Sequence, residues 1–267
     1  IPNGSGLSSS ASLEVLTGLA VRDLFGFEGI SMIDLALIGQ YSENNFNGCN
    51  CGIMDQFAVG MGKANHAIAL DCATLKYEYV PLIMEGYKLV IANTNKKRGL
   101  TDSKYNERRS ECEEAVATIS KIHPIKFLCE LGMDEFNQYS HLLTNNTILR
   151  RARHAVSEHQ RVMHAIQALK EGELNKFGQL MNESHKSLKE DYEVTGIELD
   201  TLAEEGQAGV LGSRMTGAGF GGCTVTLIAE DKVNSYIEKI SQLYKTKTNL
   251  EATFYIADIG NGACKIY

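Results

Sequence analysis

The segment that most constrains the fold is a run of glycines and serines at residues 4–10, placed directly before a helical pattern. Leu13, Leu16, Ala20 and Leu24 recur at helical spacing, so the run lies at the N-terminus of a helix. Glycine lets the backbone approach an anion closely, and the exposed N–H groups and the helix dipole favour negative charge there. Two interpretations remain open: a phosphate-binding loop, or a serine-rich helix cap with a flexible turn.

Neither of the two glycine clusters has both the residues and the structural context of a common nucleotide-binding motif. The first has no Gly-Lys-Ser/Thr after it, so it is not a Walker A loop, and a magnesium-bound hydroxyl would have to come from its serines. The second, at 217–222, contains G-x-G-x-x-G, but a strand pattern follows it where a dinucleotide fingerprint requires a helix. Neither H-R-D nor D-F-G occurs, which argues against a protein kinase. The second cluster is therefore a tight loop that comes close to a ligand or a neighbouring element.

Hydrophobic patterns along the chain predict an α+β protein with two domains. After Pro81 the chain starts afresh with an apolar strand and long charged helices, so we expect domains of residues 1–81 and 82–267. The C-terminal third has the order strand, helix, strand of a βαβ-like unit. The predicted helices are 13–24, 31–40, 105–122, 149–170 and 232–244, with one more opening at 53–59, and the predicted strands are 66–70, 76–81, 87–92, 223–228 and 253–257.

Composition limits the kinds of partner. The 267 residues are 43% hydrophobic, which is enough to bury a core. The net charge of −7 comes from interleaved acids and bases, so no basic face is offered to nucleic acid or to a membrane surface, and no apolar run reaches membrane-spanning length. Seven cysteines, an odd number, indicate thiols in a reducing compartment. We therefore expect a cytoplasmic protein with small-molecule ligands.

Acidic and histidine side chains define no site by pattern alone. Asp55 lies in a glycine-rich and apolar setting, where an aspartate can cap a helix or act as a base, and the cap is the commoner role. Glu43, in a polar segment, is by itself a solvated surface acid. His154, His159 and His164 are five residues apart, which rotates each by about 140° around a helix. They do not share a face, and we interpret them as polar positions rather than metal ligands.

Four motifs follow one another along the chain: Gly6-Leu7-Ser8-Ser9-Ser10-Ala11-Ser12-Leu13-Glu14; Cys51-Gly52-Ile53-Met54-Asp55-Gln56; Arg98-Gly99-Leu100 with Tyr105-Asn106-Glu107-Arg108-Arg109; and Met215-Thr216-Gly217-Ala218-Gly219-Phe220-Gly221-Gly222. Together they resemble the galactokinases, which belong to the GHMP superfamily of small-molecule kinases. The serine-rich and glycine-rich motifs indicate only the superfamily, whereas the Cys-Gly-Ile-Met-Asp-Gln segment is more specific to galactokinases.

The resemblance implies a fold, a reaction and a set of site residues. The fold is the two-lobed GHMP kinase fold, with an N-terminal lobe like ribosomal protein S5, a ferredoxin-like C-terminal lobe, and ATP and sugar between them. The reaction is the ATP-dependent phosphorylation of galactose at its C1 hydroxyl, which gives galactose 1-phosphate and requires no obligate protein partner. The implied residues are Gly4, Ser5, Gly6, Leu7, Ser8, Ser9 and Ser10 for ATP; Ser10 and Glu43 for Mg²⁺; Asp55 as catalytic base and sugar contact; Tyr105 as a second sugar contact; and Gly217, Gly219 and Gly221 as support for the phosphate site.

One motif of the family does not occur in this sequence. It is the upstream Arg-x-Glu-His-x-Asp-Tyr-x-x-Gly segment, which supplies sugar-binding acids and an arginine beside the base. The sequence also starts at Ile1 without an initiator methionine, so we expect an incomplete N-terminal lobe and little activity from this chain alone. Two alternatives remain: a galactose- and ATP-binding sensor without turnover, and an N-acetylgalactosamine kinase. The serine-alanine motif that is shortened in such sensors is intact here at residues 8–12, which favours an enzyme.

Overall fold

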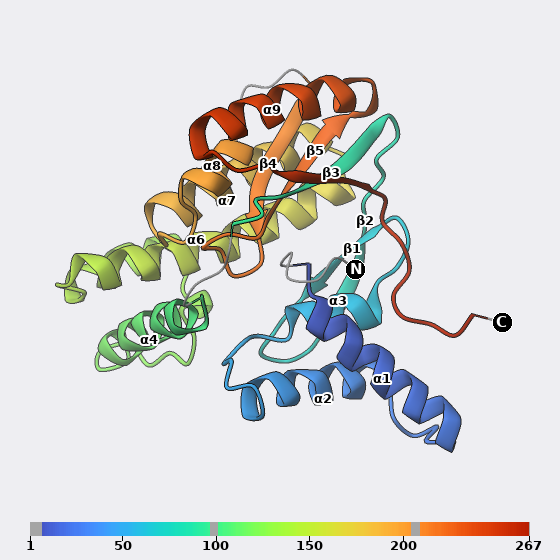
Figure 1. Ribbon diagram of the computed structural model, residues 1–267. Coiled ribbons are helices and arrows are strands. Elements are labelled where there is room, and N and C mark those ends of the chain that lie inside the picture. The colour runs from blue at the N-terminus through green and yellow to red at the C-terminus, as the bar shows by residue number, and fades with distance from the viewer. Residues whose placement is uncertain (1–6, 97–100, 204–208, 267) are drawn as a thin grey trace. The chain divides into compact units, whose positions relative to one another are not determined.

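The computed structural model describes residues 7–96, 101–203 and 209–266, with only the backbone for 101–103, and it divides the chain into two compact units (Figure 1). The first unit is Ile1–Glu85 with Ala257–Tyr267, and the second is Gly86–Ile256. Each has a hydrophobic core of its own. The predicted domains, 1–81 and 82–267, assign the last residues of the chain differently, and that assignment of domains stays a prediction.

The described part of the first unit contains three helices and a β-hairpin. They are α1 (Ser9–Phe25), α2 (Met32–Asn45), α3 (Met54–Met61), β1 (His66–Leu70) and β2 (Tyr77–Pro81). The helices pack against one another, the two strands pair antiparallel, and Ala36, Ile53 and Phe57 form the core between them. α2 begins at a capping box, in which Ser31 and Asp34 each accept a hydrogen bond from the other's backbone N–H. The predicted helix of residues 31–40 is thus confirmed.

Residues 259–263 complete the first unit from the far end of the sequence. The N–H of Gly262 donates to the carbonyl of Gly62, and the N–H of Ala263 donates to the carbonyl of Val59, each over 2.8 Å. The two backbones approach so closely that a Cβ on Gly62 would lie 2.9 Å from the nitrogen of Gly262. A glycine is therefore needed at this crossing.

A four-stranded sheet forms the centre of the second unit. Its strands are β3 (Tyr87–Asn93), β4 (Val210–Thr216), β5 (Cys223–Ala229) and β6 (Thr253–Ala257), in the order β4-β5-β3-β6, and its helices include α7 (Leu174–Glu190), α8 (Ile197–Leu202) and α9 (Val233–Thr248). β5 is antiparallel to both β3 and β4. The predicted strand–helix–strand unit is β5–α9–β6, with β3 inserted between its strands. The predicted α+β class is confirmed.

α7 covers the outer edge of the sheet at β4. A Cβ on Gly178 would lie 2.4 Å from the carbonyl oxygen of Leu211, and a Cβ on Gly212 would lie 2.1 Å from the carbonyl oxygen of Gly178. Glycine at both positions lets helix and strand touch through their backbones. The side chain of Asn182 accepts a hydrogen bond from the N–H of Ser213 over 2.8 Å. This N–H of the edge strand is therefore satisfied by α7.

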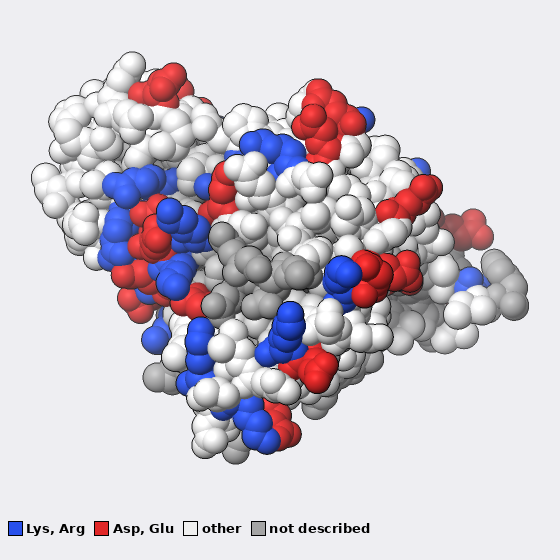
Figure 2. Space-filling view, turned by 90° about the horizontal axis from the view of Figure 1, so that it is seen from above, with Lys and Arg blue, Asp and Glu red and all other residues white. Residues whose placement is uncertain are grey.

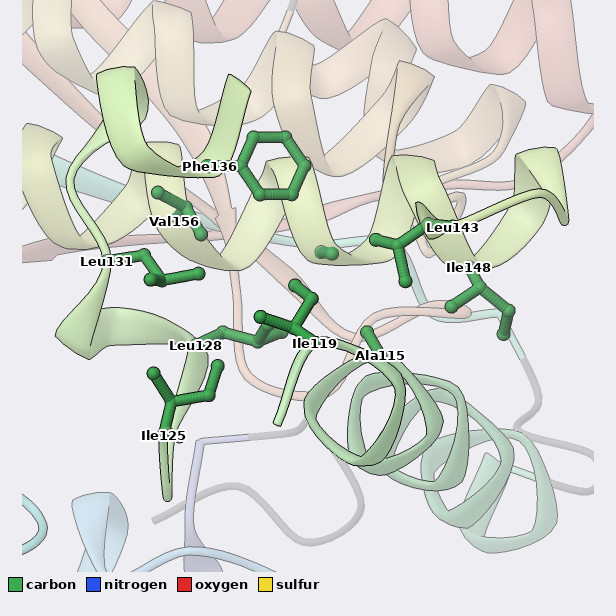
Figure 3. Packing of buried hydrophobic residues seen from close by; sticks show 10 residues of the cluster. Ala115, Ile119, Ile125, Leu128, Leu131, Phe136, Leu143, Ile148 and Val156 are labelled. Atoms are coloured by element: carbon green, nitrogen blue, oxygen red, sulfur yellow. The ribbon is translucent and has the colours of Figure 1, made fainter. Parts of the chain in front are cut away.

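A cluster of helices forms a second core beside the sheet (Figure 3). The elements are α4 (Thr101–Ile119), η1 (Leu128–Glu130), α5 (Met133–Tyr139), η2 (Ser140–Leu142) and α6 (Asn146–Lys170). Ile119 from α4, Phe136 from α5 and Val156 from α6 are buried together, and Leu131 packs with them from the connection before α5. This core supports α4, which carries Tyr105.

Charged side chains of both signs are interleaved on the face shown in Figure 2, in agreement with the charge pattern of the sequence. In the part of the chain that the structure describes, no helix combines the length and apolar character needed to cross a membrane.

The three histidines of α6 lie in different environments. His159 and His164 are exposed, whereas His154 is buried, with Nδ1 2.9 Å from the hydroxyl of Ser187 and its ring stacked 4.3 Å from that of Tyr192. The prediction that they do not form a metal site together is consistent with this arrangement, but His154 is a core residue rather than a polar surface position. Burial, reinforced by nearby arginines, lowers the pKa of His154 to about 3.

We expect the buried imidazole to make the protein less stable as the pH falls. The unfolded chain takes up a proton at this site near pH 6.5, whereas the folded state resists it down to about 3, so stability is present above the unfolded pKa and is lost as pH falls. The contribution approaches about 1.4 kcal/mol per pH unit below roughly pH 6. Urea unfolding at pH 7, 6 and 5 should show that the free energy of unfolding changes less with pH in His154→Gln than in wild type. His164→Gln should show the same pH dependence as wild type. The same pH dependence of the free energy of unfolding in both variants would contradict the lowered pKa of His154.

Candidate active site

Among the described residues, no side chain caps the backbone donors at the N-terminus of α1. Ser8 is the N-cap residue, and it lies in the left-handed region, with φ 56° and ψ 43°, where its side chain makes no capping hydrogen bond. The first N–H groups of an α-helix have no partner within the helix, and no acidic residue occupies the first turn of α1. Of the predicted ATP-binding residues, Leu7, Ser8, Ser9 and Ser10 lie at this end, while Gly4, Ser5 and Gly6 fall outside the described residues.

Two predicted metal ligands, Ser10 and Glu43, contact each other directly. The Ser10 hydroxyl and the Glu14 carboxyl both form hydrogen bonds with the Glu43 carboxylate, and the side-chain amide of Asn47 donates to it over 3.0 Å. Burial raises the pKa of Glu43, but these three hydrogen bonds outweigh that effect and hold its pKa below the ordinary value. Glu43 is thus a partly buried acceptor held in place by its neighbours, and the interpretation as a solvated surface acid is wrong.

Glu14 connects this pair to the helix that carries Asp55. Glu14 follows Ser10 by one helical turn, so both project from the same side of α1. The amide Nε2 of the buried Gln56 donates to Oε2 of Glu14 over 3.0 Å. Burial raises the pKa of Glu14, the hydrogen bond from Gln56 lowers it, and the neighbouring Glu43 raises it again, so the net pKa lies above the ordinary value. Residues of α1, α2 and α3 are therefore joined by one chain of hydrogen bonds.

Gly39 has no side chain, and this leaves room for the hydrogen bond between Glu14 and Gln56. A Cβ at Gly39 would lie 2.9 Å from Cγ of Gln56, 3.0 Å from Oε2 of Glu14 and 3.3 Å from its Cβ. Gly39 precedes Glu43 by one turn of α2, on the same side of the helix. Any side chain at Gly39 would press on the contact between Glu14 and Gln56.

The donor set fits Mg²⁺. The hydroxyl of Ser10 and the carboxylate of Glu43 are hard oxygen ligands, and Mg²⁺ is usually bound by one or two carboxylates together with water and substrate phosphates. Among the described residues, no group of three or more His, Cys, Asp and Glu side chains could hold a metal ion. One hydroxyl and one carboxylate, with water and phosphate oxygens as the other ligands, suit a magnesium–nucleotide complex.

Asp55 lies in the first turn of α3 and is not its cap. The N-cap residue is Ile53, so the interpretation of Asp55 as a helix cap is wrong. Its side chain is half-buried, and within the described part of the chain it takes part in no hydrogen bond or ion pair. The next residue, Gln56, is held by Glu14, which fixes the start of α3 relative to α1. Asp55 is thus positioned by a rigid neighbour.

The remaining predicted site residues belong to the second unit. Tyr105 lies in the second turn of α4. The glycine loop joins β4 to β5, and Gly217, Gly219 and Gly221 have φ of 78°, 84° and 128°, a region that side chains rarely adopt. A Cβ on Gly219 would lie 2.3 Å from the carbonyl oxygen of Val194, which explains the glycine there by close packing. The Arg98-Gly99-Leu100 motif lies outside the described residues.

Sequence patterns missed two residues of this site, Glu14 and Gln56. Both stand in the motifs that carry the resemblance, but neither was assigned a role. The spacing of Ser10 and Glu14, one turn apart, was the available signal, because it places their side chains on one side of α1. The partner of Glu14 on α3 is distant in sequence and has no local signature.

Comparison with known proteins shows the family of the chain. The family model described as GHMP kinases N terminal domain matches residues 1–63, and the model described as GHMP kinases C terminal matches residues 165–246. Galactokinases of Clostridium beijerinckii and Clostridium acetobutylicum are 56% and 57% identical over 268 residues, which cover 100% of this chain and 69% of each relative.

Solved structures show the same relationship. Lactococcus lactis galactokinase, determined in complex with galactose, matches with a TM-score of 0.96 and 51% identity over 100% of this chain and 69% of its own. The mevalonate kinase of L. major, at 17% identity and a TM-score of 0.61, covers 96% of this chain and 67% of its own, and shares the fold alone. The sequence identity, the two family models and the structural match lead to one conclusion: the chain belongs to the galactokinase family of the GHMP kinases.

Proposed function

We propose that this protein transfers the γ-phosphoryl group of ATP to the C1 hydroxyl of galactose and releases galactose 1-phosphate. The observation that carries the proposal is the contact between the Ser10 hydroxyl and the Glu43 carboxylate at the uncapped N-terminus of α1. Such a helix end binds phosphate, and the oxygen pair suits its magnesium ion. The names of the relatives and the galactose in the Lactococcus lactis structure support the choice of sugar.

In this proposal the first unit binds the phosphates. Ser8 and the first N–H groups of α1 would donate to phosphate oxygens, and Ser10 and Glu43 would hold Mg²⁺. When bound, the metal ion neutralises charge on the β- and γ-phosphates. Glu14 and Gln56 keep Glu43 in place relative to α3. Phosphoryl transfer depends mainly on such positioning and on electrostatic stabilisation.

Asp55 would act on the sugar. Its carboxylate would accept the proton of the C1 hydroxyl, and the phenol of Tyr105 would form a hydrogen bond with another sugar hydroxyl. Gly217, Gly219 and Gly221 would support the phosphate site through the conformation of their loop. Galactose, ATP and Mg²⁺ are the only partners that the proposal requires. We also propose a cytoplasmic location, because all seven cysteines are thiols, as is usual in a reducing compartment.

The direct test is substrate-dependent release of ADP by the natural full-length protein with ATP and Mg²⁺. We expect turnover with galactose, little with glucose or N-acetylgalactosamine, and a product whose phosphorus couples to the anomeric proton in NMR. Turnover with N-acetylgalactosamine alone would change the substrate assignment. Binding of galactose and ATP without any ADP release would identify a sensor and overturn the proposed activity.

Replacing Tyr105 by phenylalanine should raise the KM for galactose by about 5- to 30-fold and leave the KM for ATP unchanged. The change removes one hydroxyl and retains the ring, so the loss corresponds to one hydrogen bond of about 1–2 kcal/mol. Steady-state kinetics with each substrate varied in turn measures the effect. Tyr139→Phe, in the helical core of the same unit, serves as the control. Equal changes in both KM values, or none, would show that the phenol of Tyr105 does not contact the sugar.

A further inference from the structure

Three elements of the second unit meet at residues 192–194, just after α7. The carbonyl of Val194 accepts a hydrogen bond of 2.7 Å from the N–H of Phe220, in the glycine loop. The carbonyl of Tyr192 accepts one of 2.8 Å from Nε of Arg108, in α4. From α6, His154 stacks its ring on that of Tyr192. The segment thus connects the helix that carries Tyr105 with the loop that carries Gly217, Gly219 and Gly221.

Arg108 makes most of the contacts from α4. Its side chain is 11% exposed, and besides Tyr192 it donates to the carbonyl of Glu193 over 3.5 Å. Its Nη1 pairs with Glu107 over 3.1 Å and with Glu111 over 3.0 Å. These contacts use donors on three different nitrogens of one planar group. A lysine retains the charge but cannot reproduce that fork of donors.

The glycine loop contacts the same guanidinium through Phe220. Cζ of Arg108 lies 6.0 Å from the centre of the Phe220 ring, and Nζ of Lys104 lies 5.1 Å from it. Phe220 has φ 57°, an unusual conformation for a side-chain-bearing residue, and its N–H is held by Val194. At Gly219, any Cβ would collide with the carbonyl of Val194. The loop is therefore fixed against the segment and against α4 in a conformation that it would not adopt alone.

We propose that Arg108 is a positioning residue that locks α4, the helix that carries Tyr105, to the glycine loop, so that one side chain sets the position of both groups that the proposed function assigns to the substrates. This inference rests on the proposed function, which assigns Tyr105 to the sugar and the loop to the phosphate site. Arg108 follows Tyr105 by three residues, so the two side chains lie on neighbouring parts of one helix surface. Movement of α4 away from the loop would displace Tyr105 at the same time.

The test compares Arg108→Lys with wild type and with Arg109→Lys in the natural full-length protein. Arg109 is half-exposed and pairs with Glu113 one turn away, so it is a matched control. Galactose and ATP are each varied in steady state, and thermal unfolding is recorded for every variant. We expect Arg108→Lys to raise the KM values for both galactose and ATP by about 5- to 20-fold, because a coupling of this kind falls in the usual range. Arg109→Lys should leave both KM values near those of wild type.

A double-mutant cycle that combines Arg108→Lys with Phe220→Leu tests whether Arg108 acts through Phe220. If Arg108 acts through Phe220, the double variant should be no worse in kcat/KM than the more impaired single variant, since the second change removes nothing further. Additive effects, or a rise in the KM for galactose only, would overturn the inference. A lower unfolding temperature with unchanged KM values would show a purely structural role and would also overturn it. Absence of galactose-dependent turnover in wild type is a separate outcome, and it would remove the proposed function together with this inference.

Discussion

Asp55→Asn is expected to lower kcat with galactose by at least 100-fold while the affinity for ATP stays within about twofold of wild type, since a general base typically contributes 10²–10⁴-fold. Asparagine keeps the shape of the side chain but cannot accept the proton of the C1 hydroxyl. The groups at the start of α1 that are proposed to bind the phosphates are unchanged, so nucleotide binding has no reason to weaken. Coupled ADP release measures turnover, and titration with ATP measures binding.

Asp23→Asn is the matched control for this experiment. Asp23 is an exposed carboxylate in the same unit, on α1, and its described partner is the half-buried Arg22. We expect normal turnover from it. If Asp55→Asn retains more than about a tenth of the wild-type kcat, the carboxylate is not an essential base. The reaction would then depend on positioning alone, as phosphoryl transfer can.

Gly39→Ala should lower kcat by about tenfold or more and lower the free energy of unfolding by about 1–3 kcal/mol, the usual cost of overpacking a filled site. The new methyl group would lie 2.9 Å from Cγ of the buried Gln56, so either that side chain or Glu14 must shift. A shift of Glu14 alters the support of Glu43, and a shift of Gln56 alters the start of α3 beside Asp55. The measurements are kcat with saturating substrates, its dependence on Mg²⁺ concentration, and urea unfolding.

Gly18→Ala separates this effect from a general effect of alanine in a helix. Gly18 also lies within a helix of the first unit, and the Cβ would lie 3.0 Å from Cδ2 of Leu35, the flexible end of an apolar side chain. Alanine is favoured over glycine in a helix by about 0.5–1 kcal/mol, so we expect unchanged or slightly higher stability and normal turnover. Loss of turnover in both variants would mean that α1 and α2 tolerate no change in packing, and the specific role of Gly39 would be unsupported.

Periodic segments were predictable from the sequence, and elements that depend on tertiary contacts were not. The helix after the glycine-serine run, the hairpin β1–β2 and the β5–α9–β6 unit are confirmed, because their apolar residues repeat at helical or strand spacing. β4 was missed because Gly212, Ser213 and Arg214 interrupt any strand-like alternation. The strand exists because β5 pairs with it and because Asn182 of α7 satisfies one of its N–H groups. α5, α7 and α8 were not predicted either.

In the candidate site, too, local sequence patterns did not reveal the features that depend on tertiary contacts. Ser10 and Glu43 were assigned to the metal by resemblance to the galactokinases, whereas the pattern around Glu43 suggested only a solvated acid. The structure brings these two side chains into contact, although their role in binding metal stays a prediction. The hydrogen bond between Glu14 and Gln56 joins residues 42 positions apart, so no local spacing could reveal it. Long-range contacts of this kind are set by the packing of helices rather than by periodicity.

The return of residues 259–263 to the first unit determines the order in which this protein can be completed. The N-terminal part of a chain leaves the ribosome first, and domains commonly fold as they emerge. Here the hydrogen bonds of Val59 and Gly62 need Ala263 and Gly262, which are synthesised only after the whole of the second unit. The unit that begins first must therefore wait, with part of its backbone unpaired, while the unit made later is free to finish before it.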